Sequence, residues 1–195
     1  MRVLSLRERI DLLESDLSAS PPRISVYRDL PFAILRYEPE REWDLRRELR
    51  LLEARLAAVD KHVRYVSMAE LLWKAIDETE GMEAIIQLER QRGFESAQDQ
   101  VTTYLSDRDW RPLPDLLAER LKSFDSQHDI VFLVRAAAMA PAIYHMSKLL
   151  DEMQGRTEVT TILAYPGTIE GTTGLRFMDL KDREALGNYR VKIYG

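Results

Sequence analysis

The chain has 195 residues and a formal net charge of -5, with 45% hydrophobic and 31% charged residues. This balance is typical of an ordinary folded protein, and the negative charge gives no general attraction for nucleic acid or an anionic membrane surface. The absence of cysteine excludes disulfides, thiolate metal ligands and cysteine nucleophiles. No apolar run approaches the roughly 20 residues of a membrane span, and the amino terminus lacks a signal-peptide core, so we expect a cytoplasmic protein with no membrane partner.

The length favours one core, so we predict a single domain over residues 1–195. Its first part contains an amphipathic helix, predicted by the spacing of Leu6, Ile10, Leu13 and Leu17. An apolar strand follows at residues 32–37 and ends at Glu38-Pro39. A second helix has an apolar stripe made of Leu45, Leu49, Leu52, Leu56 and Val59. Arginines of residues 41–55 crowd its other face, but acids are interspersed, which favours a solvated face over a phosphate-binding one.

A helical insert of residues 67–125 separates the second predicted strand, at residues 63–66, from the third. Ser67 and Glu70 have the spacing of a capping box, which marks a helix start. Apolar periodicity then predicts four helices with breaks at glycine and proline. An insert of this length exceeds what one crossover requires, and extra helices of this kind cover a sheet or form a partner surface.

The last seventy residues contain the remaining strands. Residues 129–134 are an uninterrupted apolar run typical of a central strand, and a helix with Pro141 in its first turn follows. Its inner face is predicted to hold Met139, Ile143, Met146, Leu150 and Met153. The β-branched run at residues 159–165 predicts a buried strand that stops at Pro166-Gly167. Two short segments, 175–178 and 189–194, predict strands that pair antiparallel at one edge.

Alternating strands and helices predict an α/β fold with three layers. Its sheet is expected to be mainly parallel, with helices on both faces, the helical insert between the second and third strands, and antiparallel strands at the carboxyl-terminal edge. In such a sheet, ligands bind at the edge formed by the carboxyl ends of the parallel strands.

No motif with established chemistry is present at that edge. Neither GxxxxGK[ST] nor GxGxxG occurs, no metal-ligand spacing accompanies the three histidines, and no GxSxG elbow exists, so no cofactor is predicted. His62 and His128 precede strands and are interpreted as surface residues. The candidate cleft residues are Arg36, Arg135 and His145, because each follows or ends a strand.

Three acids are possible partners for these cleft residues. Glu38, Asp77 and Glu170 would have to converge above the sheet with Arg36 and Arg135 to form an acid–base site. The linear spacing of these residues leaves their convergence open.

The carboxyl-terminal third of the chain resembles the BrxB family, whose members are components of bacterial BREX anti-phage defence systems. The most specific block is Tyr165, Pro166, Gly167, Glu170 and Gly171, followed by the Leu-Arg-Phe of residues 175–177. Weaker matches are the strand of residues 129–133, the helix that contains His145, the amino-terminal residues 6–14 and the strand opening at Pro31-Phe32. The chain departs from the family pattern at Arg135, where a glycine-containing turn is usual, and at Glu170, where aspartate is commoner.

The resemblance implies a small non-enzymatic component, encoded beside a large ATPase, a DNA methyltransferase and a PglZ-type phosphatase-like protein. It implies an adaptor or assembly role that docks on the PglZ-like protein or on the ATPase. A second interpretation is a small nucleotide- or metal-dependent enzyme that uses the cleft at the carboxyl ends of the strands. A third and weaker one is a nucleic-acid-binding accessory protein that uses the arginine-rich helix of residues 41–55.

Overall fold

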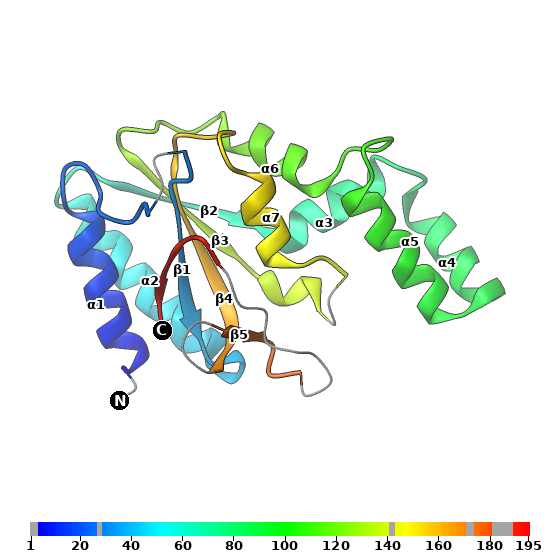
Figure 1. Ribbon diagram of the computed structural model, residues 1–195, viewed down its shortest axis with the longest axis horizontal. Coiled ribbons are helices and arrows are strands. Elements are labelled where there is room, and N and C mark those ends of the chain that lie inside the picture. Colours follow the sequence, from blue (N-terminus) through cyan, green and yellow to red (C-terminus); the bar gives the residue numbers. More distant parts are fainter. Residues whose placement is uncertain (1–3, 27–28, 141–142, 171–173, 181–188) are drawn as a thin grey trace.

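The computed structural model describes residues 4–26, 29–140, 143–170, 174–180 and 189–195. They form a three-layer α/β fold around a parallel sheet, as the sequence predicts (Figure 1). The strand order is β2-β3-β4-β1-β6. The bounds are β1 (Phe32–Tyr37), β2 (His62–Ser67), β3 (Asp129–Val134), β4 (Thr160–Glu170), β5 (Gly174–Phe177) and β6 (Lys192–Tyr194). All six residues of β1 are buried, because helices cover the sheet on both sides.

One face of the sheet is covered by α1 (Leu6–Leu17) and α2 (Glu42–Ala57). The predicted stripes of both helices are buried here against alternate residues of β1, Ala33, Leu35 and Tyr37. The capping box Ser5–Glu8 starts α1. The prediction that Val59 belongs to the buried stripe of α2 is wrong, because α2 ends at Ala57 and the Val59 side chain is 50% exposed.

The predicted helical insert and one later helix lie on the side of the opposite face. The helices are α3 (Met68–Asp77), α4 (Gly81–Arg92), α5 (Phe94–Ser106), α6 (Leu113–Leu121) and α7 (Met146–Glu152). Their apolar residues form one core cluster with Phe32 and Ile34 of β1 and with Val131 and Leu133 of β3, in which α4 and α5 pack on each other and on α3. The α4–α5 hairpin lies at the far end of the molecule from α1, with α4 outermost (Figure 1).

The chain leaves β1 and β3, the two strands that flank β4, toward opposite faces of the sheet. After β1 it passes through the short 3₁₀ turn η1 (Pro39–Arg41) into α2, on the first face. After β2 and β3 it enters α3 and the 3₁₀ turn η2 (Ala136–Met139), on the second face. This divergence gives a topological switch point at the carboxyl ends of the strands, where open α/β sheets hold their ligands.

The helix predicted after β3 begins later than expected. Ala140 is extended (φ -72°, ψ 150°), and α7 starts only at Met146. The physical reason is that the residue before a proline is sterically driven out of the helical region. Pro141 itself lies outside the described residues. The apolar side chains predicted for the inner face are nevertheless buried, which shows that burial does not require a continuous helix.

Strand β4 does not stop at Pro166-Gly167, contrary to the prediction. It continues to Glu170 because its pairing changes: up to Pro166 it pairs parallel with β1, and from Gly167 onward it pairs antiparallel with β5. The carbonyl of Pro166 accepts a hydrogen bond from the Met178 amide at 2.9 Å. The missing N–H of proline therefore falls where the strand changes partner.

The two last strands pair differently from each other. Strand β5 is antiparallel to β4, as expected, but β6 is parallel to β1 with Ala33 opposite Lys192. It is also shorter than predicted. Residues 178–191 separate β5 from β6, and this length meets the minimum of about a dozen residues for a parallel crossover.

Gly167 is the most tightly enclosed glycine in the described chain. A Cβ atom there would collide with the backbone carbonyl oxygen of Arg176 on β5. We expect Gly167→Ala to lower the free energy of unfolding by about 3 kcal/mol, because backbone cannot move aside as a side chain can.

Gly155→Ala is the matched comparison, measured by urea unfolding. Gly155 has a positive φ of 70°, but a Cβ atom added to it would meet no other atom within 4 Å, so only the backbone strain of about 1 kcal/mol applies. Equal losses for both variants would contradict the β4–β5 contact.

Candidate functional site

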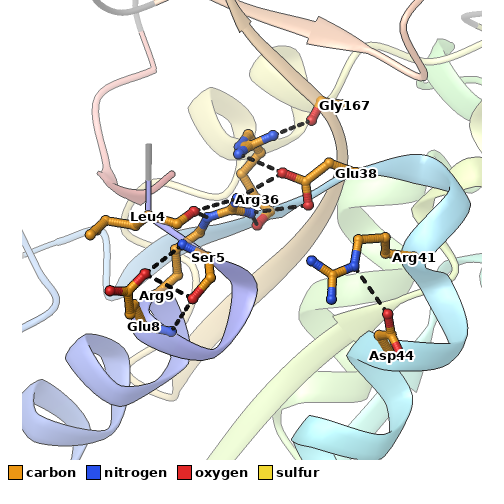
Figure 2. A network of polar contacts seen from close by, with 9 residues as sticks. All are labelled: Leu4, Ser5, Glu8, Arg9, Arg36, Glu38, Arg41, Asp44 and Gly167. Carbon is orange, nitrogen blue, oxygen red and sulfur yellow. Dashed lines mark hydrogen bonds and ion pairs between the residues drawn. The ribbon is translucent and has the colours of Figure 1, made fainter. Parts of the chain in front are cut away.

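The carboxyl end of β1 carries an ion network buried between α1 and β4 (Figure 2). Arg36, on β1, donates from one Nη to the Glu38 carboxylate at 2.9 Å and from the other to the Gly167 carbonyl at 3.1 Å. Arg9, on α1, donates to the same Glu38 oxygen at 2.7 Å and to the Arg36 carbonyl at 2.8 Å. One carboxylate thus joins a helix and a strand from different parts of the chain.

Burial sets the energetics of this network. Arg9 and Arg36 are 1% and 3% exposed, and burial of unpaired cations would be costly. Burial disfavours the charged form of Glu38, but the Arg9 hydrogen bond and the nearby Arg36 charge outweigh it and lower the pKa of Glu38 to about 2. The Nε of Arg36 has no hydrogen-bond partner among the described residues.

Sequence reasoning identifies Arg36 as a cleft residue but misses Arg9. A signal was present, since Arg9 lies one turn after Leu6 and one turn before Leu13, on the buried stripe of α1. A cation on an apolar stripe indicates a buried anionic partner.

We call Tyr165, Pro166, Gly167, Glu170 and Gly171 the family-signature block, and its first three residues lie at the junction where β4 changes its pairing from β1 to β5. Tyr165 is buried, and its ring contacts Phe177 and Tyr189 edge-on, with centroids 5.4 and 5.9 Å apart. Burial raises the pKa of the Tyr165 hydroxyl, so the phenol is neutral and donates to the Leu175 carbonyl. The Pro166 carbonyl accepts a hydrogen bond from the Met178 amide, just after β5, and the Gly167 carbonyl accepts one from Arg36.

The last two signature residues lie beyond this junction. Glu170 is exposed and pairs with Arg176 across the β4–β5 ribbon. Gly171 lies outside the described residues. The described part of the block therefore holds a strand pair against the sheet.

Arg135 lies apart from this network, in a groove at the carboxyl ends of β2 and β3. We call it the carboxyl-edge groove, and it consists of two hollows of about 310 Å³ each that share Arg46 and Arg135. The charged hollow is lined by those two residues and by Leu49, Arg50, Tyr65, Ser67, Glu70 and Val134. The apolar hollow adds Tyr37, Pro39, Glu42, Ala69, Ala137, Ala138, Pro166 and Met178.

Backbone geometry presents Arg135 to the groove. It is in the left-handed region (φ 61°, ψ 34°), between β3 and η2, and its side chain is exposed. A residue other than glycine is uncommon in this conformation. A strained turn therefore carries a cation at this point of the groove.

The remaining predicted site residues do not join Arg36 and Arg135. His145 is exposed at the N-cap of α7 and lines neither hollow of the groove. Asp77 is the last residue of α3, and because α3 starts at the sheet edge, its length of about 15 Å separates Asp77 from that edge. The acids considered as a convergent set are thus dispersed in the fold.

Two histidines meet at the opposite, amino-terminal edge of the sheet. The rings of His62 and His128 are 6.3 Å apart, and both side chains are about half exposed. The His128 Nδ1 contact with the Asp125 carboxylate at 2.8 Å raises the pKa of His128 and lowers that of Asp125. Within the described ranges, no three histidine, aspartate or glutamate residues are placed to hold a metal ion.

Glu38→Gln tests the buried network. The variant leaves two buried guanidinium groups without an anion, so we expect the free energy of unfolding to fall by about 3 kcal/mol. The pKa of Glu38 is lowered in the folded state. Its contribution to the free energy of unfolding is therefore fully present above the unfolded pKa of 4.5 and is lost as the pH falls toward the folded pKa of about 2.

The measurement is urea unfolding between pH 2 and pH 7. Glu170→Gln is the control, since its ion pair with Arg176 is at the surface and is worth less than about 1 kcal/mol. A Glu38→Gln variant as stable as this control at pH 7 would show that the carboxylate does not balance the two arginines.

Asp125→Asn tests the histidine pair. We expect NMR titration to show a raised His128 pKa in the wild type that falls in the variant, because the variant removes the negative charge beside the ring. Because the pKa of His128 is raised in the folded protein, protonated His128 stabilises the fold at low pH, and this contribution is lost as the pH rises through the folded-state pKa. An unchanged His128 titration would contradict the contact.

The relation of the chain to known proteins rests on one family match. No curated protein and no solved structure matches it. None of the helices in the described ranges is both long and apolar enough to cross a membrane. The family model described as "BREX protein BrxB" matches residues 64–193, which is more than half of the chain and includes β3, β4, β5 and the first two residues of β6. The chain therefore belongs to the BrxB family of BREX phage-resistance system components.

Proposed function

We propose that this protein is a non-enzymatic adaptor of a BREX defence system, which docks on the PglZ-like protein or on the large ATPase of that system. Family membership supports a place in the system. The single structural observation that carries the adaptor role is the α4–α5 hairpin, which extends beyond the layer that covers the sheet (Figure 1).

The outer helix of the hairpin, α4, contributes little to the core, whereas α5 buries Ala97, Val101, Tyr104 and Leu105. Ile85 is the one buried residue of α4, while Met82, Ile86 and Leu88 are only partly covered. Phe94, at the turn between the two helices, is 64% exposed. Apolar side chains on a projecting element are typical of a surface that another protein covers.

Trp73 extends the same argument to α3, where it is 53% exposed. Large aromatic side chains dominate the energy of protein interfaces when a partner buries them. A helical insert that is larger than a crossover needs, with exposed aromatic residues on it, therefore fits a docking module better than a catalytic one.

The ion pairs of Arg41 in η1 and of three of the arginines of α2 argue against the nucleic-acid interpretation. Arg41 and Arg47 pair with Asp44, and Arg46 pairs with Glu42. Arg55 pairs with Glu14 of α1. A helix face neutralised in this way provides few free cations for phosphates.

Co-expression with the PglZ-like protein and, separately, with the large ATPase tests the proposal. We expect the wild-type chain to co-elute with one of them in size-exclusion chromatography. Phe94→Asp together with Trp73→Asp should abolish co-elution, because burial of a charge without a partner is unfavourable.

Leu12→Asp is the matched control. Leu12 is 51% exposed on α1, across the sheet from the hairpin, so this change should leave co-elution intact. Separate elution of folded wild-type chain from both partners would contradict the adaptor role, and equal loss with Leu12→Asp would contradict the hairpin as the contact.

A further inference from the structure

The carboxyl-edge groove has the composition of a ligand site that the adaptor role does not require. Each of its two hollows measures about 310 Å³, at the lower end of the range for small-molecule pockets. One hollow is lined by several charged side chains, and the other is mostly apolar. They meet at Arg135, so a ligand with a charged end and an apolar body would be able to occupy both.

Two of the three cations of the charged hollow make no contact with the described residues that holds the fold together. Arg50 and Arg135 are exposed, and their guanidinium groups make no hydrogen bond or ion pair with any described residue. Arg46 differs, since its Nε donates to Glu42 at 2.9 Å and its guanidinium lies over the Trp43 ring. Two forked cations that face one hollow without a partner provide bidentate donors for an oxyanion.

The acids of the groove offset these cations only in part. Glu42 is neutralised by Arg46 and also accepts a hydrogen bond from the Tyr37 hydroxyl at 2.5 Å. Glu70 has no side-chain partner among the described residues and opposes an anion. With Glu42 paired, two cations face one carboxylate, and the hollow has a net positive charge.

We propose that the carboxyl-edge groove binds a small phosphate ester of the size of a mononucleotide. Its phosphate lies between Arg50 and Arg135, and its apolar body lies in the apolar hollow beside Ala138 and Pro166. The groove is at the topological switch point of the sheet, where α/β folds bind such ligands. The proposal concerns binding and is independent of the adaptor function.

Isothermal titration of the purified chain with AMP and with inorganic pyrophosphate tests this site. We expect both to bind the wild type, and both to bind at least tenfold more weakly to Arg50→Gln and Arg135→Asn. Asparagine is chosen at position 135 because it tolerates the left-handed backbone. Glu70→Gln should tighten binding of both, because it removes the opposing charge.

Arg47→Gln controls for general electrostatics, since Arg47 is an exposed cation of α2 that pairs with Asp44 and does not line the groove. Ala138→Leu should weaken AMP but not pyrophosphate, because it fills only the apolar hollow. Circular dichroism verifies that each variant is folded.

Three results would overturn the proposal. The first is that neither probe gives a heat of binding at millimolar concentration. The second is that Arg47→Gln and Arg135→Asn lose the same affinity for the probes. The third is that the chain binds an oligonucleotide but does not bind AMP. Retained AMP binding in Ala138→Leu would overturn the placement of the apolar body.

Discussion

The balance of two buried guanidinium groups by one carboxylate is the constraint on which this end of the fold depends. Glu38 is the first residue after β1, and its side chain meets Arg9 from α1 and Arg36 from β1 itself (Figure 2). Either cation alone in the interior would be strongly unfavourable. The three groups are therefore stable only together, which fixes α1 against the sheet and brings the Gly167 carbonyl of β4 onto Arg36.

This arrangement explains why Tyr165 and Gly167 of the family-signature block make contacts within the protein at an edge where the strand order suggests a site. Arg36 and Tyr165 are opposite each other in the β1–β4 register and are both buried. Both Nη atoms of Arg36 are engaged with Glu38 and Gly167, and the Tyr165 hydroxyl donates to the β5 backbone, so these two side chains are held by protein contacts. The unpaired cations lie instead beside β3, where the strained turn at Arg135 exposes one.

Most of the fold was predictable because its signals are local. The spacing of Leu6 to Leu17 specifies α1, and the apolar run of residues 129–134 gives β3 with its observed bounds. The errors occurred where pairing overrides local chemistry. Pro166-Gly167 has the composition of a turn, but the β5 backbone holds it in a strand, and no local pattern specifies that β6 joins β1 in parallel.

The sequence by itself determined the α/β class, the helical insert and the family, since periodicity and a short specific block are enough for each. Only the tertiary structure decided which charged residues are partners. Arg9 and Arg36 are 27 positions apart and share one anion, whereas Arg50 and Arg135 share a hollow in which neither forms an ion pair with a described residue. Charge pairing depends on distance in space and on burial, and neither quantity is encoded in the linear spacing of the residues.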